Sequence, residues 1–105
     1  MNDRELLELA ARAAGYGELR ILDDSSIIVH ARRWNPLADD GDAMRLAVKL
    51  DISLRQRFAM VQAEFPWADE QFNERRVICE PVLEDHCAPA RRAIVRAAAE
   101  IGKRM

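Results

Sequence analysis

The spacing of apolar residues constrains this chain most, because it alternates between the period of a helix and the period of a strand. In three segments the apolar residues recur every three to four positions, which predicts amphipathic helices. These segments are residues 3–14, 40–51 and 88–102. Between them, runs of β-branched residues or of alternating polarity predict four strands. The strands fall at residues 18–22, 26–31, 54–64 and 75–82. The element order is therefore α-β-β-α-β-β-α.

This order favours an α+β fold. Consecutive strands are most simply joined as hairpins, so we expect a mainly antiparallel four-stranded sheet packed with three helices. A chain of 105 residues can bury one core without a metal or a disulfide, so residues 1–105 are interpreted as a single domain.

The second half of the chain contains a change of phase. The strand expected over residues 54–64 places Phe58 and Met60 on one face, but Val61 begins an apolar series on the other face. A period of two cannot shift by one residue without a local disruption, which predicts a β-bulge or a strand end near Met60. Residues 66–74 open with a proline and are polar, so they are expected to form a loop.

The first and third expected helices have alanine-rich faces. Ala10, Ala11 and Ala14 share one face of the first helix, and Ala97 and Ala98 share one face of the third. Alanine buries less apolar area than leucine, but it permits close approach. We therefore expect these helices to pack closely on the sheet or on each other.

The segment 34–42, before the second helix, combines an aromatic side chain with several acidic ones. Its candidate interaction residues are Trp34, Asn35, Asp39, Asp40 and Asp42. An aspartate at a helix N-terminus accepts backbone N–H bonds and meets the positive end of the helix dipole, so a cap at Asp39 or Asp40 accounts for part of the cluster. Binding residues also concentrate in such loops. The segment is thus a structural junction or a binding surface, and the structural interpretation is favoured.

A second candidate interaction surface consists of arginines on the expected sheet. These are Arg55, Arg57, Arg75 and Arg76. If their strands pair, several guanidinium groups share one face and could receive a phosphate or an acidic partner. Alternatively, the arginines form a solvated face balanced by Glu64 and Glu80.

The overall charge restricts the partner class. The formal net charge is −2, which argues against binding to nucleic acid by bulk positive charge. Of the 16 basic residues, 14 are arginine. This excess suits phosphate or carboxylate recognition, but it is also what a GC-rich genome would produce.

The residue types of metal and catalytic sites do not form a recognisable set. Cys79, His86 and Cys87 lie within nine residues, with His30 as a fourth metal ligand in principle. Their spacing lacks the paired form of structural zinc sites, and we expect Cys79 to face the core and the other two to precede the third helix. Neither histidine belongs to an acid-base set. We therefore predict no catalytic residues, no metal and no cofactor.

Two sequence stretches, "WNPLADDGDAMRLAVKL" and "ARRAIVRAAAEIGK", together with the N-terminal "DRELLELAARAAG", carry a family resemblance. With them the chain resembles the phage ABA sandwich domain, a family of small proteins of tailed phages and prophages. The resemblance covers most of the chain and is weakest between Phe65 and Asp85. It implies an α-β-α sandwich and a phage-encoded protein in the host bacterial cytoplasm. It implies no established activity.

These inferences lead to two functional hypotheses. The first is a non-enzymatic accessory protein of a phage or prophage that binds a host or phage macromolecule, most simply a protein. The second is a small module that binds nucleic acid or a nucleotide through the arginine rows. The acidic start of the chain does not resemble a signal peptide, and the apolar runs are too short to cross a bilayer, so we expect a cytoplasmic protein without a membrane partner. A homo-oligomer is compatible with the sequence.

Overall fold

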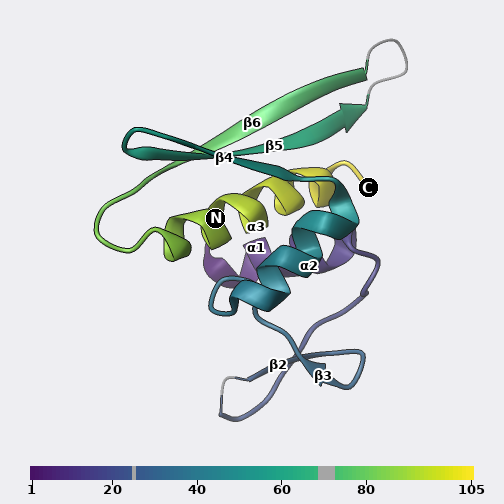
Figure 1. The fold of residues 1–105 in the computed structure, drawn as a ribbon. Coiled ribbons are helices and arrows are strands. Elements are labelled where there is room, and N and C mark those ends of the chain that lie inside the picture. Colours follow the sequence, from purple (N-terminus) through teal and green to yellow (C-terminus); the bar gives the residue numbers. More distant parts are fainter. Residues whose placement is uncertain (25, 69–72) are drawn as a thin grey trace.

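The computed structural model describes the whole chain except residues 25 and 69–72, and it has an α+β fold (Figure 1). Its helices are α1 (Asp3–Ala13), α2 (Asp40–Leu50) and α3 (Cys87–Lys103). Its described strands are β1 (Arg20–Ile21), β2 (Ile27–Val29), β3 (Arg32–Arg33), β4 (Ser53–Arg57), β5 (Met60–Ala68) and β6 (Asn73–Pro81). None of the helices in the described part of the chain has the length and apolar character that a membrane span requires.

The three helices lie where the sequence predicts them, because local signals determine their starts. Asn2 caps α1 by accepting the Glu5 N–H, and Asp39 caps α2 by accepting the Asp42 N–H. The Cys87 N–H at the start of α3 donates to the Asp85 carboxylate. The ends of all three helices agree with the prediction to within a residue or so.

The prediction that alanine faces allow close packing is confirmed between α1 and α3. Ala10 and Ala11 of α1 and Ala97 and Ala98 of α3 are completely buried. The closest approach is at Gly102, where a Cβ atom would lie only 2.1 Å from the Leu9 carbonyl oxygen. Only glycine fits there without moving one helix away from the other.

The larger sheet has the strand order β4-β5-β6, and α3 covers one of its faces. The alternate residues Val61, Ala63 and Phe65 of the central strand are all buried, and they belong to one core with α3 and α1. Figure 1 shows α3 directly beneath β5 and β6, with the helices on one side of the sheet only. The layers are therefore sheet, α3 and α1. The expected α-β-α arrangement, with helices on both faces, is not what the described residues form.

The single four-stranded sheet expected from the sequence is wrong. The described residues form two separate three-stranded antiparallel sheets, and the smaller one has the order β1-β2-β3. The first hairpin, β1–β2, is as predicted, but β2 then pairs with β3, which the sequence analysis missed. The two-residue turn at His30 and Ala31 has positive φ at both positions, which turns the chain back so that β3 lies beside β2. The strand β3 therefore occupies the edge of β2 at which the second predicted hairpin could have joined the same sheet.

The expected strand over residues 54–64 is also wrong as a continuous element. It is a hairpin of β4 and β5, closed by a two-residue turn at Phe58 and Ala59. The phase change near Met60 thus marks a strand end, one of the two predicted outcomes, and not a bulge. The sequence analysis missed the turn because it contains neither glycine nor asparagine, the residues that favour the positive φ found at Phe58.

The loop expected over residues 66–74 begins later, because β5 continues to Ala68 and β6 begins at Asn73. Residues 69–72 lie outside the described part of the chain. Pro66 is tolerated in the strand because it lies beyond the reach of β4. The first residue of β4, Ser53, pairs with Glu64, so after Glu64 the strand β5 pairs with β6 only. Trp67 is held by its edge contact with Phe65, at a ring distance of 6.1 Å.

Candidate functional site

The first candidate site, residues 34–42, is built around a buried tryptophan. Trp34 is only 7% exposed and belongs to the core. Its ring meets the ring of Tyr16 edge to face at 5.8 Å, and its backbone N–H donates to the Ile27 carbonyl. Pro36, two residues on, is fully buried. The tryptophan thus joins the small sheet to the helices, which leaves little of its surface for a ligand.

Three of the polar residues in this segment bind one another at the start of α2. The Asp39 carboxylate accepts the Asp42 N–H at 2.8 Å, and the Asp42 carboxylate accepts the Asn35 N–H at 2.9 Å. Arg45 donates to Asp42 at 2.7 Å, and this hydrogen bond raises the pKa of the arginine. The Asn35 side chain in turn accepts the Leu37 N–H. These carboxylates therefore serve the loop and the helix cap.

Asp40 has a different partner, on another helix. The Arg91 guanidinium of α3 donates to the Asp40 carboxylate at 2.6 Å and to the Leu37 carbonyl oxygen at 2.8 Å. Arg91 is largely buried. The interaction fastens the start of α2 to the start of α3. The structure thus brings the five predicted residues of segment 34–42 together, and each of the four polar ones has a partner within the fold.

The four predicted arginines do not form one row. Arg75 pairs across the sheet with Pro66, and Arg76 pairs with Phe65, so neither lies opposite β4. Arg75 donates to the Glu64 side chain at 2.8 Å and to the Asp51 carboxylate at 3.1 Å, which ties the end of α2 to the sheet. The balance by Glu64 that the sequence suggested is therefore real.

Arg76 lies on the opposite face of the sheet from Arg75, because successive residues of a strand alternate. Its guanidinium stacks over the Trp67 ring at 4.1 Å, and Arg104 from the C-terminal end contacts the same ring at 4.1 Å. The second proposed balancing group, Glu80, faces the helices and accepts from Arg96 at 2.7 Å. Arg75 and Arg76 are thus occupied by contacts within the fold.

Arg55 and Arg57 remain as a basic pair on β4. Both are exposed, and they lie on the face of the sheet away from α3, opposite Gln62 and Met60. Among the described residues, no carboxylate lies within 4.0 Å of either guanidinium group. This is the part of the predicted arginine surface that the fold leaves available.

The turn next to these arginines exposes a phenylalanine that the sequence analysis placed within a strand. Phe58 is 107% exposed, and its φ of 53° lies in the left-handed region, where a bulky residue is rare. A hydrogen bond from the Val82 N–H to the Ala59 carbonyl holds the β6–α3 connection beside this turn, and Leu83 in that connection is 86% exposed. Figure 1 shows this turn at the end of the sheet far from the C-terminus. We call Arg55, Arg57, Phe58 and Leu83 the tip surface.

The sequence identified Arg55 and Arg57 as candidate residues of the tip surface, but it gave no signal for its two apolar members. Phe58 fits the apolar phase of a strand, and only the pairing of Arg57 with Met60 reveals that it lies in a turn. Leu83 follows a predicted strand and gives no periodic signal of its own.

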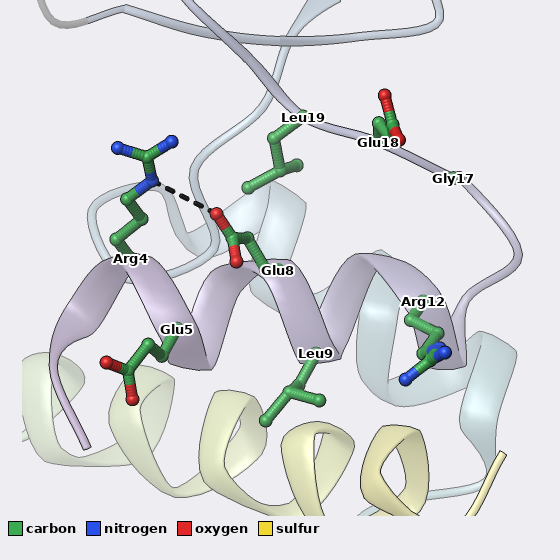
Figure 2. A pocket seen from close by; sticks show the side chains of 8 residues that line it. All are labelled: Arg4, Glu5, Glu8, Leu9, Arg12, Gly17, Glu18 and Leu19. Atoms are coloured by element: carbon green, nitrogen blue, oxygen red, sulfur yellow. Dashed lines mark hydrogen bonds and ion pairs between the residues drawn. The ribbon is translucent and has the colours of Figure 1, made fainter.

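A groove of about 750 Å³ runs along α1 (Figure 2). It lies between one face of the helix and residues 17–19, with Leu9 and Leu19 among the apolar side chains in its wall. The Arg4 guanidinium donates to the Glu8 carboxylate at 3.0 Å across its rim. Among the described residues, its lining contains no histidine, cysteine, serine or lysine, so these residues provide no nucleophile with a neighbouring base.

The residues weighed as metal ligands lie apart. Cys79 is exposed on the outer face of the larger sheet, so the expectation that it faces the core is wrong. The neighbouring Ile78 takes the inner face, opposite Ala63, and the alternation of the strand sends Cys79 outward. His86 precedes α3, as expected, whereas Cys87 is the first residue of that helix, and both are exposed. His30 lies in the β2–β3 turn against Tyr16. Within the described residues, no three potential ligands converge.

The chain is thus an α+β protein in which the outer face of the larger sheet and the tip surface are exposed. Comparison with family models, with curated proteins and with solved structures gives no significant match.

Proposed function

We propose that this chain is a phage- or prophage-encoded accessory protein without enzymatic activity, and that it binds an acidic protein of the host or the phage through the tip surface. The observation that carries the proposal is Phe58. Its side chain is fully exposed at the end of a hairpin, on a backbone conformation that favours glycine.

The phenylalanine is unfavourable for the isolated fold in two ways. A left-handed conformation costs a residue with a side chain about 1–2 kcal/mol relative to glycine. A fully exposed ring also gains nothing from burial. Strained residues cluster where a ligand is bound, and large apolar side chains that become buried on binding supply much of the affinity of an interface. Leu83 is a second exposed apolar side chain, in the connection that the Val82–Ala59 hydrogen bond holds beside the turn.

The charges around Phe58 select the kind of partner. Arg55 and Arg57 lack a carboxylate partner among the described residues, so an acidic surface would be complementary. The alternative, a nucleic-acid or nucleotide module, would need a continuous basic stripe. Because Arg75 is bound by Glu64 and Asp51, signs alternate on this face, which supports a protein partner over a nucleic acid.

The phage origin rests on the resemblance of residues 34–50 and of the C-terminal helix to the phage ABA sandwich family. That segment acts as a structural junction in this fold, so the resemblance supports a shared fold element and the tip surface supports the binding role. A cytoplasmic location is part of the same proposal.

The proposal is tested by affinity capture from lysate of an infected host, with and without nuclease treatment, on three immobilised proteins. These are the parent, Phe58→Gly and the matched control Met44→Ala, which removes an exposed apolar side chain from α2. We expect the parent and the control to retain the same protein and Phe58→Gly to lose it. Equal retention by Phe58→Gly would contradict the proposal, and retention that nuclease abolishes would favour the nucleic-acid alternative.

A further inference from the structure

The strand β4 lies at an edge of the larger sheet, and no described strand pairs with its outer side. All five of its residues are exposed. Native proteins usually shorten, cover or charge such an edge, because its unpaired backbone groups can pair with another chain. Here the edge is five residues long and uncovered, and its charges are the two arginines of the tip surface.

The register of the hairpin shows which backbone groups are available. In a hairpin with a two-residue turn, the pair that closes the turn is hydrogen-bonded, and bonded and non-bonded pairs alternate from there. The closing pair is Arg57 and Met60, so Arg57 and Arg55 direct their N–H and C=O groups toward β5. Leu54 and Gln56 consequently direct theirs to the open edge.

We infer that β4 receives an extended acidic segment of the protein partner as a fourth strand of this sheet. The inference rests on the proposed function and specifies its binding mode. Leu54 and Gln56 supply the main-chain hydrogen bonds, and alternate side chains of the added strand supply specificity. Phe58 lies at the end of the same strand, where it contacts whatever follows the added segment.

The two faces of β4 specify the pattern of the added strand. Arg55 and Arg57 lie two residues apart on the outer face, so acidic side chains two residues apart on the added strand would lie opposite them. On the inner face, Leu54 is 40% exposed and lies in one row with Ala63 and Ile78. An apolar residue next to the acidic one opposite Arg55, on the side away from Arg57, would extend this row. The predicted recognition pattern is therefore acidic and apolar residues in alternation.

A second copy of the chain is a poor occupant of this edge. If two β4 strands pair antiparallel with the fullest overlap, Arg55 of each copy lies directly opposite Arg55 of the other. Like charges directly opposite one another destabilise a strand pair. The same arginines that disfavour self-association favour an acidic strand.

The binding test uses a fluorescein-labelled ten-residue peptide that alternates glutamate with valine, and a control peptide with lysine in place of glutamate. Fluorescence anisotropy should show the glutamate peptide binding at least about tenfold more tightly than the lysine peptide. The double variant Arg55→Glu with Arg57→Glu should lose the glutamate peptide. The matched variant Arg20→Glu with Arg32→Glu, which makes the same charge change on the small sheet, should retain it. Equal binding by both variants would overturn the inference.

The backbone contribution is tested at Gln56. Gln56→Pro removes an N–H that the fold does not use, whereas Gln56→Ala keeps it. We expect Gln56→Ala to bind the glutamate peptide as the parent does and Gln56→Pro to lose at least about tenfold. If Gln56→Pro binds equally well while Phe58→Gly loses the lysate protein, strand addition is wrong and the proposed function stands. If neither variant affects either readout, both are wrong.

Amide hydrogen exchange gives a result that does not depend on the folding of a variant. In the parent protein, the glutamate peptide should slow exchange at the Leu54 and Gln56 amides and leave the Arg55 amide, already bonded to β5, nearly unchanged. Protection of Leu54 and Gln56 without peptide, together with a dimer in sedimentation, would identify a second copy as the occupant and overturn the inference. Tighter binding of a thymidine oligonucleotide at these residues would also overturn it.

Discussion

Replacing Trp34 by alanine tests whether segment 34–42 is a structural junction. Trp34 is 7% exposed, so the substitution removes an almost completely buried ring, and its edge contact with Tyr16 is lost as well. Large aromatic truncations in cores cost about 3 to 5 kcal/mol. The unfolding entropy of a domain of this size is roughly 0.2 kcal/mol per kelvin, so a loss of about 4 kcal/mol should lower the melting temperature by about 15 to 20 °C.

The assay is a thermal melt followed by circular dichroism, with Trp34→Phe and Met44→Ala as controls. Trp34→Phe keeps an aromatic ring in the core and should lose less than half as much stability as Trp34→Ala. Met44→Ala changes an exposed side chain of α2 and should stay within about 0.5 kcal/mol of the parent. A melting temperature of Trp34→Ala within a few degrees of the parent would refute the structural interpretation and make residues 34–42 a binding surface again.

Four further outcomes are expected from the same melting assay. Gly102→Ala should destabilise by about 1–3 kcal/mol or more, because the new Cβ would overlap the Leu9 carbonyl and one helix must move; unchanged stability would mean that α1 and α3 pack less closely. Asp39→Ala should cost only about 1 kcal/mol, the usual value of a lost N-cap, and a loss as large as that of Trp34→Ala would contradict the capping role. Phe58→Gly should be at least as stable as the parent, because glycine relieves the positive φ, and a marked destabilisation would show that the ring is buried in solution. A chelator should leave the melting temperature unchanged and elemental analysis should find no stoichiometric zinc, whereas a clear drop would indicate a site at Cys79, His86 and Cys87.

Some of the candidate site could be predicted from the sequence because its contacts are local. The cap at Asp39 spans three residues, and the burial of Trp34 beside a proline and a helix start follows from the same short segment. The partner of Asp40 could not be predicted, because Arg91 lies 51 residues away on another helix. Arg91 and Arg92 have the same sequence context, and only packing brings the first to Asp40 and the second to Asp3.

The sequence by itself determined the three helices, the β1–β2 hairpin and the α+β class. Each of these depends on signals within about one turn of helix or one hairpin: the caps at Asn2 and Asp39, the apolar period of α3, and the turn residues before Ile27. Such signals act between residues that are close along the chain, so the sequence contains all the interacting groups within one short segment.

Only the tertiary structure decided how the strands are shared between sheets and which side chains face outward. The return of β3 beside β2 and the turn at Phe58 depend on positive φ angles at residues other than glycine, so the sequence does not indicate them. The separation of Arg55 and Arg57 from Arg75 and Arg76 depends on the register of β5 with β6. A strand period of two is compatible with several registers, and burial of Val61, Ala63 and Phe65 against α3 selects one. That selection leaves β4 at the edge with its arginines and Phe58 exposed.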